Sequence, residues 1–345
     1  MRRLYFLLPG TTSKFRCGGL WAELKTLEIA SKICPAEVVT YRQRQPELLW
    51  LDELLRDSLE NLKDAIFVVS WGFDVPKLIS RLKNLNVIYH AHSSGYGFDL
   101  PASVPIVTVS RNTLGYWGQR SPHSLLYYLP NEISPKFQNI AGDRDIDVLV
   151  QSRKSSRYLI EQLIPALRSQ CRVEVINYYV DSLETLFHRT KVYLYDSAEY
   201  WAVQGVTEGF GLQPLEAIAC GCQVFSSVNH GLSDYLDPAF NCYKIAGYSQ
   251  EFDMQRILKV IERFNQGDRH IFANSHLLAE LLAEYRTENI ISRLKVILTE
   301  INEFFDHRQS QRHHIPDLNT WQILKLRSQR VYAKISQRLH NGSSR

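Results

Sequence analysis

Two glutamates around a glycine-broken turn are the residues of this sequence best placed to do chemistry. In the stretch TEGFGLQPLEAIACG, Glu208 and Glu216 stand eight positions apart. Proline suits the first helical position and glycine the left-handed residue that ends a helix, so we expect a short helix from Gln213 or Pro214 to Cys220. The unpaired amides at its start would bind an anion such as a diphosphate.

The two carboxylates could hold hydroxyl groups on either side of that diphosphate. A carboxylate does not bind phosphate, but it accepts two hydrogen bonds from vicinal hydroxyls such as those of a ribose. Glu216, in the first helical turn, would then hold a ribose, and Glu208 would lie beside a sugar. For either residue alone, complementing the helix dipole is the simpler interpretation. A dinucleotide-binding fingerprint is excluded, because Pro214 occupies its third glycine position.

Short apolar runs alternate along the chain with stretches of helical spacing such as 20–30 and 158–170. Continuous Val, Ile and Leu runs are typical of strands in parallel sheets that helices cover on both faces. We therefore expect an α/β protein. The candidate strands are residues 4–9, 65–70, 86–93, 106–110, 124–130, 146–152, 173–179, 192–197 and 223–227.

A polar stretch from Pro135 to Asp145 interrupts this alternation and is interpreted as a linker. It divides the chain into two Rossmann-like domains, predicted at 1–138 and 139–305, which a basic helical tail follows at 306–345. The length of 345 residues fits two domains of ordinary size. Ligands of open α/β sheets bind beyond the carboxyl ends of the strands, so two facing sheets would place a cleft between the domains.

The composition is that of a globular protein with a mild positive charge. The chain has 40 Lys and Arg against 36 Asp and Glu, and its six cysteines are sparse for its length. We interpret these cysteines as reduced thiols. The apolar run before Pro9 is too short for a signal peptide, and no segment has the length of a membrane span. These features predict a cytoplasmic protein.

The tail from His307 to Arg345 carries eight Lys or Arg and a single acid, Asp317. Its apolar line, which includes Trp321 and Leu324, favours a helix that packs on the body and keeps its basic face in solvent. Peripheral contact with the inner face of a membrane is the alternative. Nucleic acid is not expected as a partner, because aromatic interleaving and a recognised binding module are lacking.

The string EGFGLQPLEAIACG resembles the E-x7-E signature of the glycosyltransferase group 1 family, which consists of retaining enzymes with the GT-B fold. Segments 109–117, 128–137 and 221–236 are similar to further elements of the family, although His230 and Asp234 replace its usual glycine and glutamate. The resemblance implies two facing Rossmann-like domains with a cleft between them and a C-terminal helix that crosses back. The first domain would bind the acceptor and the second the nucleotide-sugar donor.

The resemblance also implies roles for individual residues. Glu208 would position the donor sugar, and His92 at the end of a strand would contact it, whereas His90 is expected to be structural. Lys154 and the adjacent Arg153 would neutralise the departing diphosphate. Glu208, His92, Lys154 and Arg153 are therefore the predicted catalytic residues. The predicted donor-binding residues are Gly18, Gly19, Gly209, Phe210, Gly211, Leu212 and Glu216.

The motif DRDID at 143–147 spells D-x-D, which is the metal-binding signature of the other main glycosyltransferase fold. It lies in the predicted linker, away from the expected diphosphate site, and we interpret it as a group of solvated acids. Lys154 and the helix start can supply the positive charge that a metal would otherwise provide. We expect no essential metal and no cofactor, the nucleotide diphosphate-sugar being a co-substrate.

The expected function is transfer of a sugar from this donor to an unidentified acceptor hydroxyl, in polysaccharide, glycolipid or glycoconjugate synthesis. Two alternatives stay open. One is a nucleotide-sugar-binding protein without catalysis, which the shortened spacing of Arg153 and Lys154 and the altered His230 and Asp234 favour. The other is a sugar-nucleotide epimerase or hydrolase on the same fold.

Overall fold

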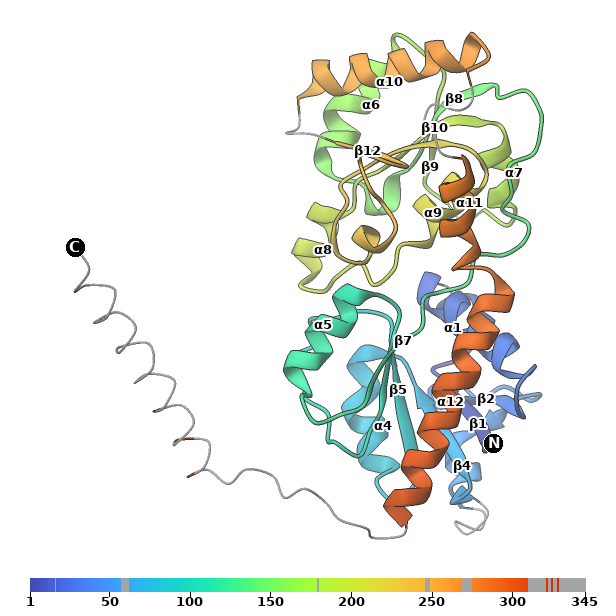
Figure 1. Cartoon of the computed structure of the whole chain (residues 1–345), viewed down its shortest axis with the longest axis vertical. Coiled ribbons are helices and arrows are strands. Elements are labelled where there is room, and N and C mark those ends of the chain that lie inside the picture. Colours follow the sequence, from blue (N-terminus) through green and yellow to red (C-terminus); the bar gives the residue numbers. More distant parts are fainter. Residues whose placement is uncertain are drawn as a thin grey trace. The chain divides into compact units, whose positions relative to one another are not determined.

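The structure is a computed structural model, and the chain divides into two compact units, Met1–Asn302 and Glu303–Arg345 (Figure 1). The predicted basic tail lies mostly outside the described residues. Among the helices that are described, none is long and apolar enough to cross a membrane. The structure describes residues 1–15, 17–56, 62–178, 180–245, 249–268 and 275–309, together with Trp321, Leu324 and Ser328.

The first sheet is parallel throughout and has seven strands in the described part of the chain, in the order β3-β2-β1-β4-β5-β6-β7. Its order reverses beside β1, as in doubly wound nucleotide-binding sheets. The strands are β1 (Arg3–Leu8), β2 (Ala36–Thr40), β3 (Leu49–Trp50), β4 (Ala65–Val69), β5 (Asn86–Ala91), β6 (Ile106–Thr108) and β7 (Leu126–Tyr128). The helices that follow them are α1 (Gly18–Ala30), α2 (Leu51–Leu54), α4 (Val75–Arg81) and α5 (Arg111–Arg120), with short 3-10 turns η1 (Ser13–Phe15) and η2 (Gly72–Asp74).

The second sheet is also parallel, with the order β12-β11-β10-β8-β9 in the described residues. Its strands are β8 (Ile146–Gln151), β9 (Val173–Ile176), β10 (Thr190–Tyr195), β11 (Gln223–Ser226) and β12 (Tyr243–Lys244). Its helices are α6 (Ile164–Arg168), α7 (Leu183–His188), α8 (Ala198–Gln204), α9 (Leu212–Ala219), α10 (Gln250–Asn265) and α11 (Ser275–Ala283). The shorter helical turns are η3 (Ser152–Lys154), η4 (Leu159–Leu163, of π type) and η5 (His230–Asp234).

Both faces of the first sheet are covered by helices. Alternate residues of a strand point to opposite faces, so each strand contributes side chains to both. On β5, Val87 and Tyr89 join an apolar cluster with residues of α2, α4 and α5. Ile88 and His90 point to the other face, where they line a small cavity together with residues of α1 and of α12 (Thr287–Gln309). The two parallel sheets confirm the predicted α/β fold.

Every predicted strand overlaps an observed one, and three strands were not predicted. Of these, β3 and β12 have two residues each, too few for a periodic signal, and the β2 sequence AEVVT has a run of only two large apolar residues, Val38 and Val39. The predicted helix 158–170 is observed as an unbroken helical run over 157–168, in which the π turn η4 is followed directly by α6 from Ile164. Pro165, the second residue of α6, lacks a backbone amide, so the regular α-helical hydrogen bond is missing at this position.

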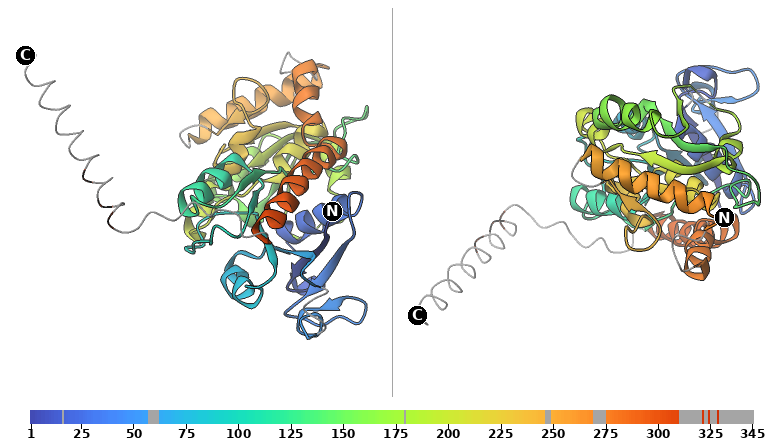
Figure 2. Two further views of the ribbon diagram at one scale, coloured as in Figure 1. Left: turned by 60° about the horizontal axis from the view of Figure 1, so that its bottom comes forward. Right: turned by 90° about the horizontal axis from the view of Figure 1, so that it is seen from above.

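Helix α12 returns from the second sheet to the first, as the fold prediction requires. Its Leu294, Ile297 and Leu298 line the cavity on the face of β1, β4, β5 and β6, and the backbone amide of Arg2 donates to the Asn302 side chain over 3.1 Å. Figures 1 and 2 show this red-orange helix running along the blue and cyan strands. Residues up to Asn302, inside the predicted second domain, therefore pack on the first.

The two chain crossings between the sheets are held together by Arg286. The backbone amide of Ile133 donates to the Tyr285 carbonyl over 2.8 Å. The Arg286 guanidinium donates to the carbonyls of Ile133, Ser134 and Phe137 over 3.3, 2.9 and 2.7 Å. One planar, multidonor side chain thus satisfies carbonyls that no strand or helix pairs.

We predict that Arg286→Lys destabilises the protein, because an ammonium on a flexible stem cannot serve three carbonyls spread over five residues. Leaving one or two of these acceptors unsatisfied should lower the free energy of unfolding by about 1–3 kcal/mol. Urea unfolding followed by circular dichroism measures this change. The exposed Arg168→Lys serves as control, and equal stabilities of the two variants would contradict the assigned role of Arg286.

Candidate active site

The second sheet brings Lys154 and Glu208 together at the point where its strand order reverses. Strand β9 lies on one side of β8 and β10 on the other, and ligands of open α/β sheets bind beyond the carboxyl ends at such a point. Lys154 ends the turn η3 directly after β8, and Glu208 lies in the chain between β10 and α9. The Lys154 Nζ atom is 3.3 Å from the Glu208 Oε1 atom.

The Glu208 carboxylate is buried, with 4% of the residue exposed, and three donors surround it. Besides Lys154 these are the Tyr195 hydroxyl and the Trp201 indole N–H, which lies 2.7 Å from Oε2. The Lys154 ammonium also sits 4.6 Å from the centre of the Trp201 ring, within cation–π range. Burial, followed by the charge of Glu208, raises the pKa of Tyr195 well above its ordinary value, so Tyr195 stays a neutral donor.

Sequence analysis did not identify Tyr195 or Trp201. Tyr195 is the last residue of β10, whose final four residues, 192–195, are all apolar or aromatic. Trp201 lies on the short helix α8 that follows. Their positions in the chain gave one usable signal, since Tyr195 is the last residue of β10 and Trp201 follows on α8, at the carboxyl edge of the sheet. Their contact with Glu208 depends on the fold of the intervening loop.

The loop after Glu208 packs backbone against backbone. A Cβ atom added to Gly209 would lie 1.5 Å from the His92 carbonyl oxygen, and one added to Gly231 would lie 2.1 Å from the Gly209 oxygen. Gly211 has a φ of 79°, which favours glycine. These glycines are therefore required by packing, whatever the loop binds. The Phe210 side chain lies in the core, where its ring centre is 5.4 Å from that of Tyr235.

The same loop meets the end of β5 through hydroxyl groups. Ser93 Oγ donates to the Thr207 carbonyl over 2.7 Å, and Ser94 Oγ is 2.8 Å from Thr207 Oγ1. Nearby, the Arg111 amide at the start of α5 donates to Asp234 Oδ2 over 2.8 Å. Asp234, which departs from the family pattern, thus pairs with a helix start of the first sheet, where a negative charge is favourable.

The helix α9 is found where it was predicted, with two differences. It begins at Leu212 and not at Gln213 or Pro214, so Pro214 is its third residue and Glu216 its fifth, beyond the first turn. It ends before Cys220, and Gly221 follows with a φ of 82°, as predicted. The amide groups at its start remain next to Gly211.

Glu216 is partly buried on α9. Burial, and to a lesser extent the charge of Glu184, raises the pKa of Glu216 to about 8. Its carboxyl group is therefore largely protonated at neutral pH. A protonated carboxyl both donates and accepts hydrogen bonds, which suits the hydroxyl groups of a ribose.

Of the remaining predicted residues, Gly18, Gly19 and Arg153 are exposed, and Leu212 is partly buried. Gly18 and Gly19 begin α1, and an added Cβ atom on Gly18 would meet nothing within 4 Å in the described structure. Arg153 is exposed in η3, one residue before Lys154. Leu212, partly buried, opens α9.

Both histidines at the end of β5 bind a residue that sequence analysis did not identify, Glu23 of α1. Its Oε2 atom is 2.6 Å from His90 Nδ1 and 2.7 Å from His92 Nε2. Glu23 occupies a buried position of the apolar face of α1, three residues after Leu20, and a charged residue at such a position was the available signal. Burial alone would raise the pKa of Glu23, but the two imidazoles outweigh it and lower the pKa to about 2.

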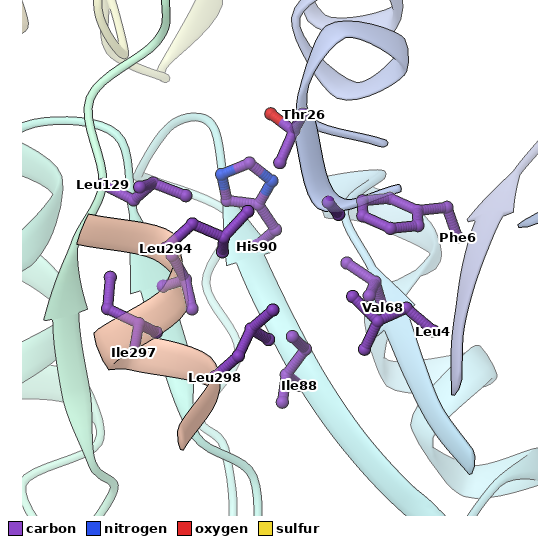
Figure 3. A pocket seen from close by; sticks show the side chains of 12 residues that line it. Leu4, Phe6, Thr26, Val68, Ile88, His90, Leu129, Leu294, Ile297 and Leu298 are labelled. Carbon is purple, nitrogen blue, oxygen red and sulfur yellow. The ribbon is translucent and has the colours of Figure 1, made fainter. Parts of the chain in front are cut away.

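The environments of the two rings differ. His90 is 2% exposed and lines an apolar cavity of about 20 Å³ together with Thr26 and residues such as Phe6 and Leu294 (Figure 3). The His92 side chain keeps 15% of its surface exposed. Burial lowers the pKa of His92 below its ordinary value, which favours the neutral ring. Glu23, His90 and His92 also offer three possible metal ligands within 4.8 Å of one another.

The comparison with protein families agrees with the position of this site. Residues 138–273, which hold β8 to α10 and therefore Lys154, Glu208 and Glu216, match the family described as "Glycosyl transferases group 1". This part of the chain is therefore similar to group 1 glycosyltransferases. No curated protein matches the sequence significantly.

Solved structures extend the similarity to the fold of both sheets. HepE from Anabaena, solved with UDP and glucose, is 14% identical, with a TM-score of 0.62 over 87% of this chain and 100% of its own. Sucrose-phosphate synthase from Thermosynechococcus elongatus is 11% identical, with a TM-score of 0.60 over 88% and 100%. A glycosyltransferase from Rickettsia africae is 10% identical, with a TM-score of 0.64 over 88% and 99%. The predicted GT-B fold is confirmed.

We predict that Gly209→Ala strongly destabilises the protein, because the new methyl group would overlap the His92 carbonyl. Overpacking of this kind costs about 1–3 kcal/mol or more. Gly115→Ala is the matched control. Gly115 is exposed inside α5 with open space around its Cβ position, so this change should stabilise the protein by about 1 kcal/mol. Thermal unfolding of both variants measures the contrast, and a Gly209→Ala protein as stable as the wild type would contradict it.

We also predict a stability contribution from Glu216 that falls with rising pH. The folded state keeps the Glu216 proton up to about pH 8, whereas the unfolded chain releases it near the ordinary value of 4.5. Between these values the folded state binds more protons, so its free energy of unfolding decreases as pH rises. Glu216→Gln should lose less stability than the wild type between pH 5 and pH 8.5, and the exposed Glu251→Gln should follow the wild type. Parallel curves for all three proteins would disprove the shift.

Proposed function

We propose that the protein transfers a sugar from a nucleotide diphosphate-sugar to an acceptor hydroxyl with retention of the anomeric configuration. The observation that carries the proposal is the pairing of Lys154 with the buried Glu208 carboxylate at the switch point of the second sheet. It lies inside the segment that matches the group 1 family. The GT-B likeness to HepE, solved with UDP-glucose, supports a UDP-sugar as the donor to test first.

The diphosphate would lie at the start of α9, within reach of Lys154. The Lys154 side chain is 28% exposed, and an ammonium has three donors, so it can keep its contact with Glu208 while binding a phosphate oxygen. Arg153 would add a second positive charge from the adjacent position. Fixed cations are suited to a leaving group that gains negative charge in the transition state.

The donor sugar would lie between Glu208 and His92. Tyr195 and Trp201 both donate to the Glu208 Oε2 atom. The position of the Glu208 carboxylate is therefore set before the donor binds. Such preorganisation lowers the cost of binding a polar ligand. The departing diphosphate would help to deprotonate the incoming hydroxyl on the same face of the sugar, since we assign no carboxylate as a covalent nucleophile. The acceptor would enter from the first domain.

The reaction as proposed needs no metal, because Lys154, Arg153 and the α9 amides neutralise the diphosphate. We place it in the cytoplasm, and the predicted membrane contact of the basic tail lies outside the described residues. The acceptor determines the product, which we expect to be a polysaccharide, a glycolipid or another glycoconjugate.

The function is tested in two steps, donor binding and then transfer. We expect one nucleotide-sugar among UDP-, GDP- and ADP-sugars to raise the melting temperature, because a ligand that binds only the folded state stabilises it. Mass spectrometry of reactions with that donor should then show a glycosylated acceptor from a panel of hydroxyl compounds. Product formed without any acceptor would instead identify an epimerase or hydrolase. Tight donor binding without turnover over the whole panel would identify a binding protein.

Glu208 provides the residue-level test of this function. We predict that Glu208→Ala lowers kcat/KM by about 10²-fold or more, the usual loss when a preorganised polar group at the reacting centre is removed. Glu208→Gln keeps the shape and separates loss of charge from loss of packing. The exposed Glu161→Ala in the same domain should retain wild-type kinetics. A folded Glu208→Ala protein that transfers sugar at the wild-type rate would refute the assigned role.

A further inference from the structure

The buried carboxylate of Glu23 binds two imidazoles through one oxygen atom. His90 Nδ1 and His92 Nε2 lie 2.6 and 2.7 Å from Oε2. An ionised carboxylate is only an acceptor, so both ring nitrogens must carry a proton. This fixes the proton of His90 on Nδ1 and that of His92 on Nε2. It leaves His92 Nδ1, when the ring is neutral, with a lone pair that can accept a hydrogen bond.

These short separations favour hydrogen bonds over a bound metal. Ligand atoms about 2.0–2.2 Å from a zinc ion in tetrahedral geometry are roughly 3.3 Å from one another. The two nitrogen–oxygen separations found here are well below that value and match charge-assisted hydrogen bonds. A metal could enter this cluster after the side chains separate, which is an outcome that experiment can distinguish.

His90 holds the carboxylate from the apolar side of the cluster. Its ring lies against the cavity between β5, α1 and α12, and His90 Nε2 has no hydrogen-bond partner in the described structure (Figure 3). An unpaired lone pair is tolerated there more easily than an unpaired N–H of a charged ring, which agrees with a proton on Nδ1 alone. The rings of His90 and His92 have centres 4.3 Å apart, so His90 also packs against its neighbour.

His92 connects the cluster of Glu23, His90 and His92 to the loop of residues 208–211. Its ring is held by Glu23, while its carbonyl oxygen lies directly against Gly209, the residue after Glu208. Its ring is the more exposed of the two, at 15% against 3% for His90. His92 therefore links the Glu23 cluster to the backbone of the loop that carries Glu208.

We propose that Glu23 is the positioning residue of the active site: it fixes the orientation and the tautomer of His92, so that His92 Nδ1 accepts a hydrogen bond from a hydroxyl of the donor sugar. This inference rests on the proposed function for the contact between His92 and the sugar. Glu23 itself touches no substrate and acts through His92. His90 serves as the anchor that keeps the Glu23 carboxylate in place.

A double-mutant cycle tests whether Glu23 acts through His92. We expect Glu23→Gln to lower kcat/KM for the donor roughly tenfold, the size typical of removing a carboxylate that orients a working histidine. In the His92→Ala background the same change should have no further effect, because interacting residues are not additive. Glu28→Gln, an exposed change on the same helix, should leave the kinetics unchanged. Equal tenfold losses in both backgrounds would overturn the proposal.

The placement of the protons is tested without any turnover. Long-range ¹H–¹⁵N NMR of the histidine rings should show Nδ1–H for His90 and Nε2–H for His92, with the His92 tautomer preference reduced in Glu23→Gln. A protonated His90 ring or an Nδ1–H tautomer of His92 would overturn the inference. So would stoichiometric zinc in the purified protein that EDTA removes with loss of these signals. If the wild type transfers no sugar from any donor, the proposed function fails, and the assigned role of Glu23 in transfer fails with it. The histidine tautomers still report in that case whether the hydrogen bonds of the cluster are as described.

Discussion

The close contact between the Gly209 backbone and the His92 carbonyl is the constraint on which the arrangement of this site depends. A residue with a side chain does not fit at position 209, because its Cβ would lie 1.5 Å from that oxygen. The contact joins the carboxyl end of β5 in the first sheet to the loop before α9 in the second. Glu208 is the residue before it on one side, and the ring of His92 belongs to the other. The backbone segments that carry these two residues are thereby packed against one another.

The clusters around Glu208 and Glu23 each contain a buried carboxylate. An unpaired buried charge costs several kcal/mol, so a buried acid is stable only when donors surround it. Glu208 takes its donors from Lys154, Tyr195 and Trp201, and Glu23 takes its donors from the two histidines. In each case the donors come from different elements of the chain. Moving one of these elements away would leave a buried carboxylate without a donor. The free-energy cost of that loss holds the elements together.

The two domains share a topology in which chain order reverses next to the first strand, and the chemistry follows this reversal. In the second sheet, the segments after β8 and β10 diverge at their carboxyl ends and leave Lys154 and Glu208 on either side of the switch point. In the first sheet, β1 leads to the exposed glycines at the start of α1, and β5 leads to His92. Helix α12 packs on the first sheet after the chain has completed the second. Arg286 secures this return by binding carbonyls of the outward crossing.

Local sequence signals were sufficient for the elements and for part of the site. Continuous apolar runs identified the buried strands, because both faces of a parallel sheet are covered, and Pro214 and Gly221 located α9 to within two residues. Strands of two residues gave no periodic signal. The start of α9 was placed one or two residues late, since Pro214 fits the third position as well as the first. That small error moved Glu216 from the first turn to the second.

The sequence by itself determined the parallel α/β fold and the loop that carries Glu208, because period, turn chemistry and a long motif are local properties of the chain. Tertiary structure alone decided which side chains meet. Glu23 and His90 are 67 residues apart, and Lys154 and Glu208 are 54 apart, so no local pattern links them. Their contacts arise because parallel strands collect their following loops at one edge of each sheet. The contact of Gly209 with the His92 carbonyl was decided in the same way.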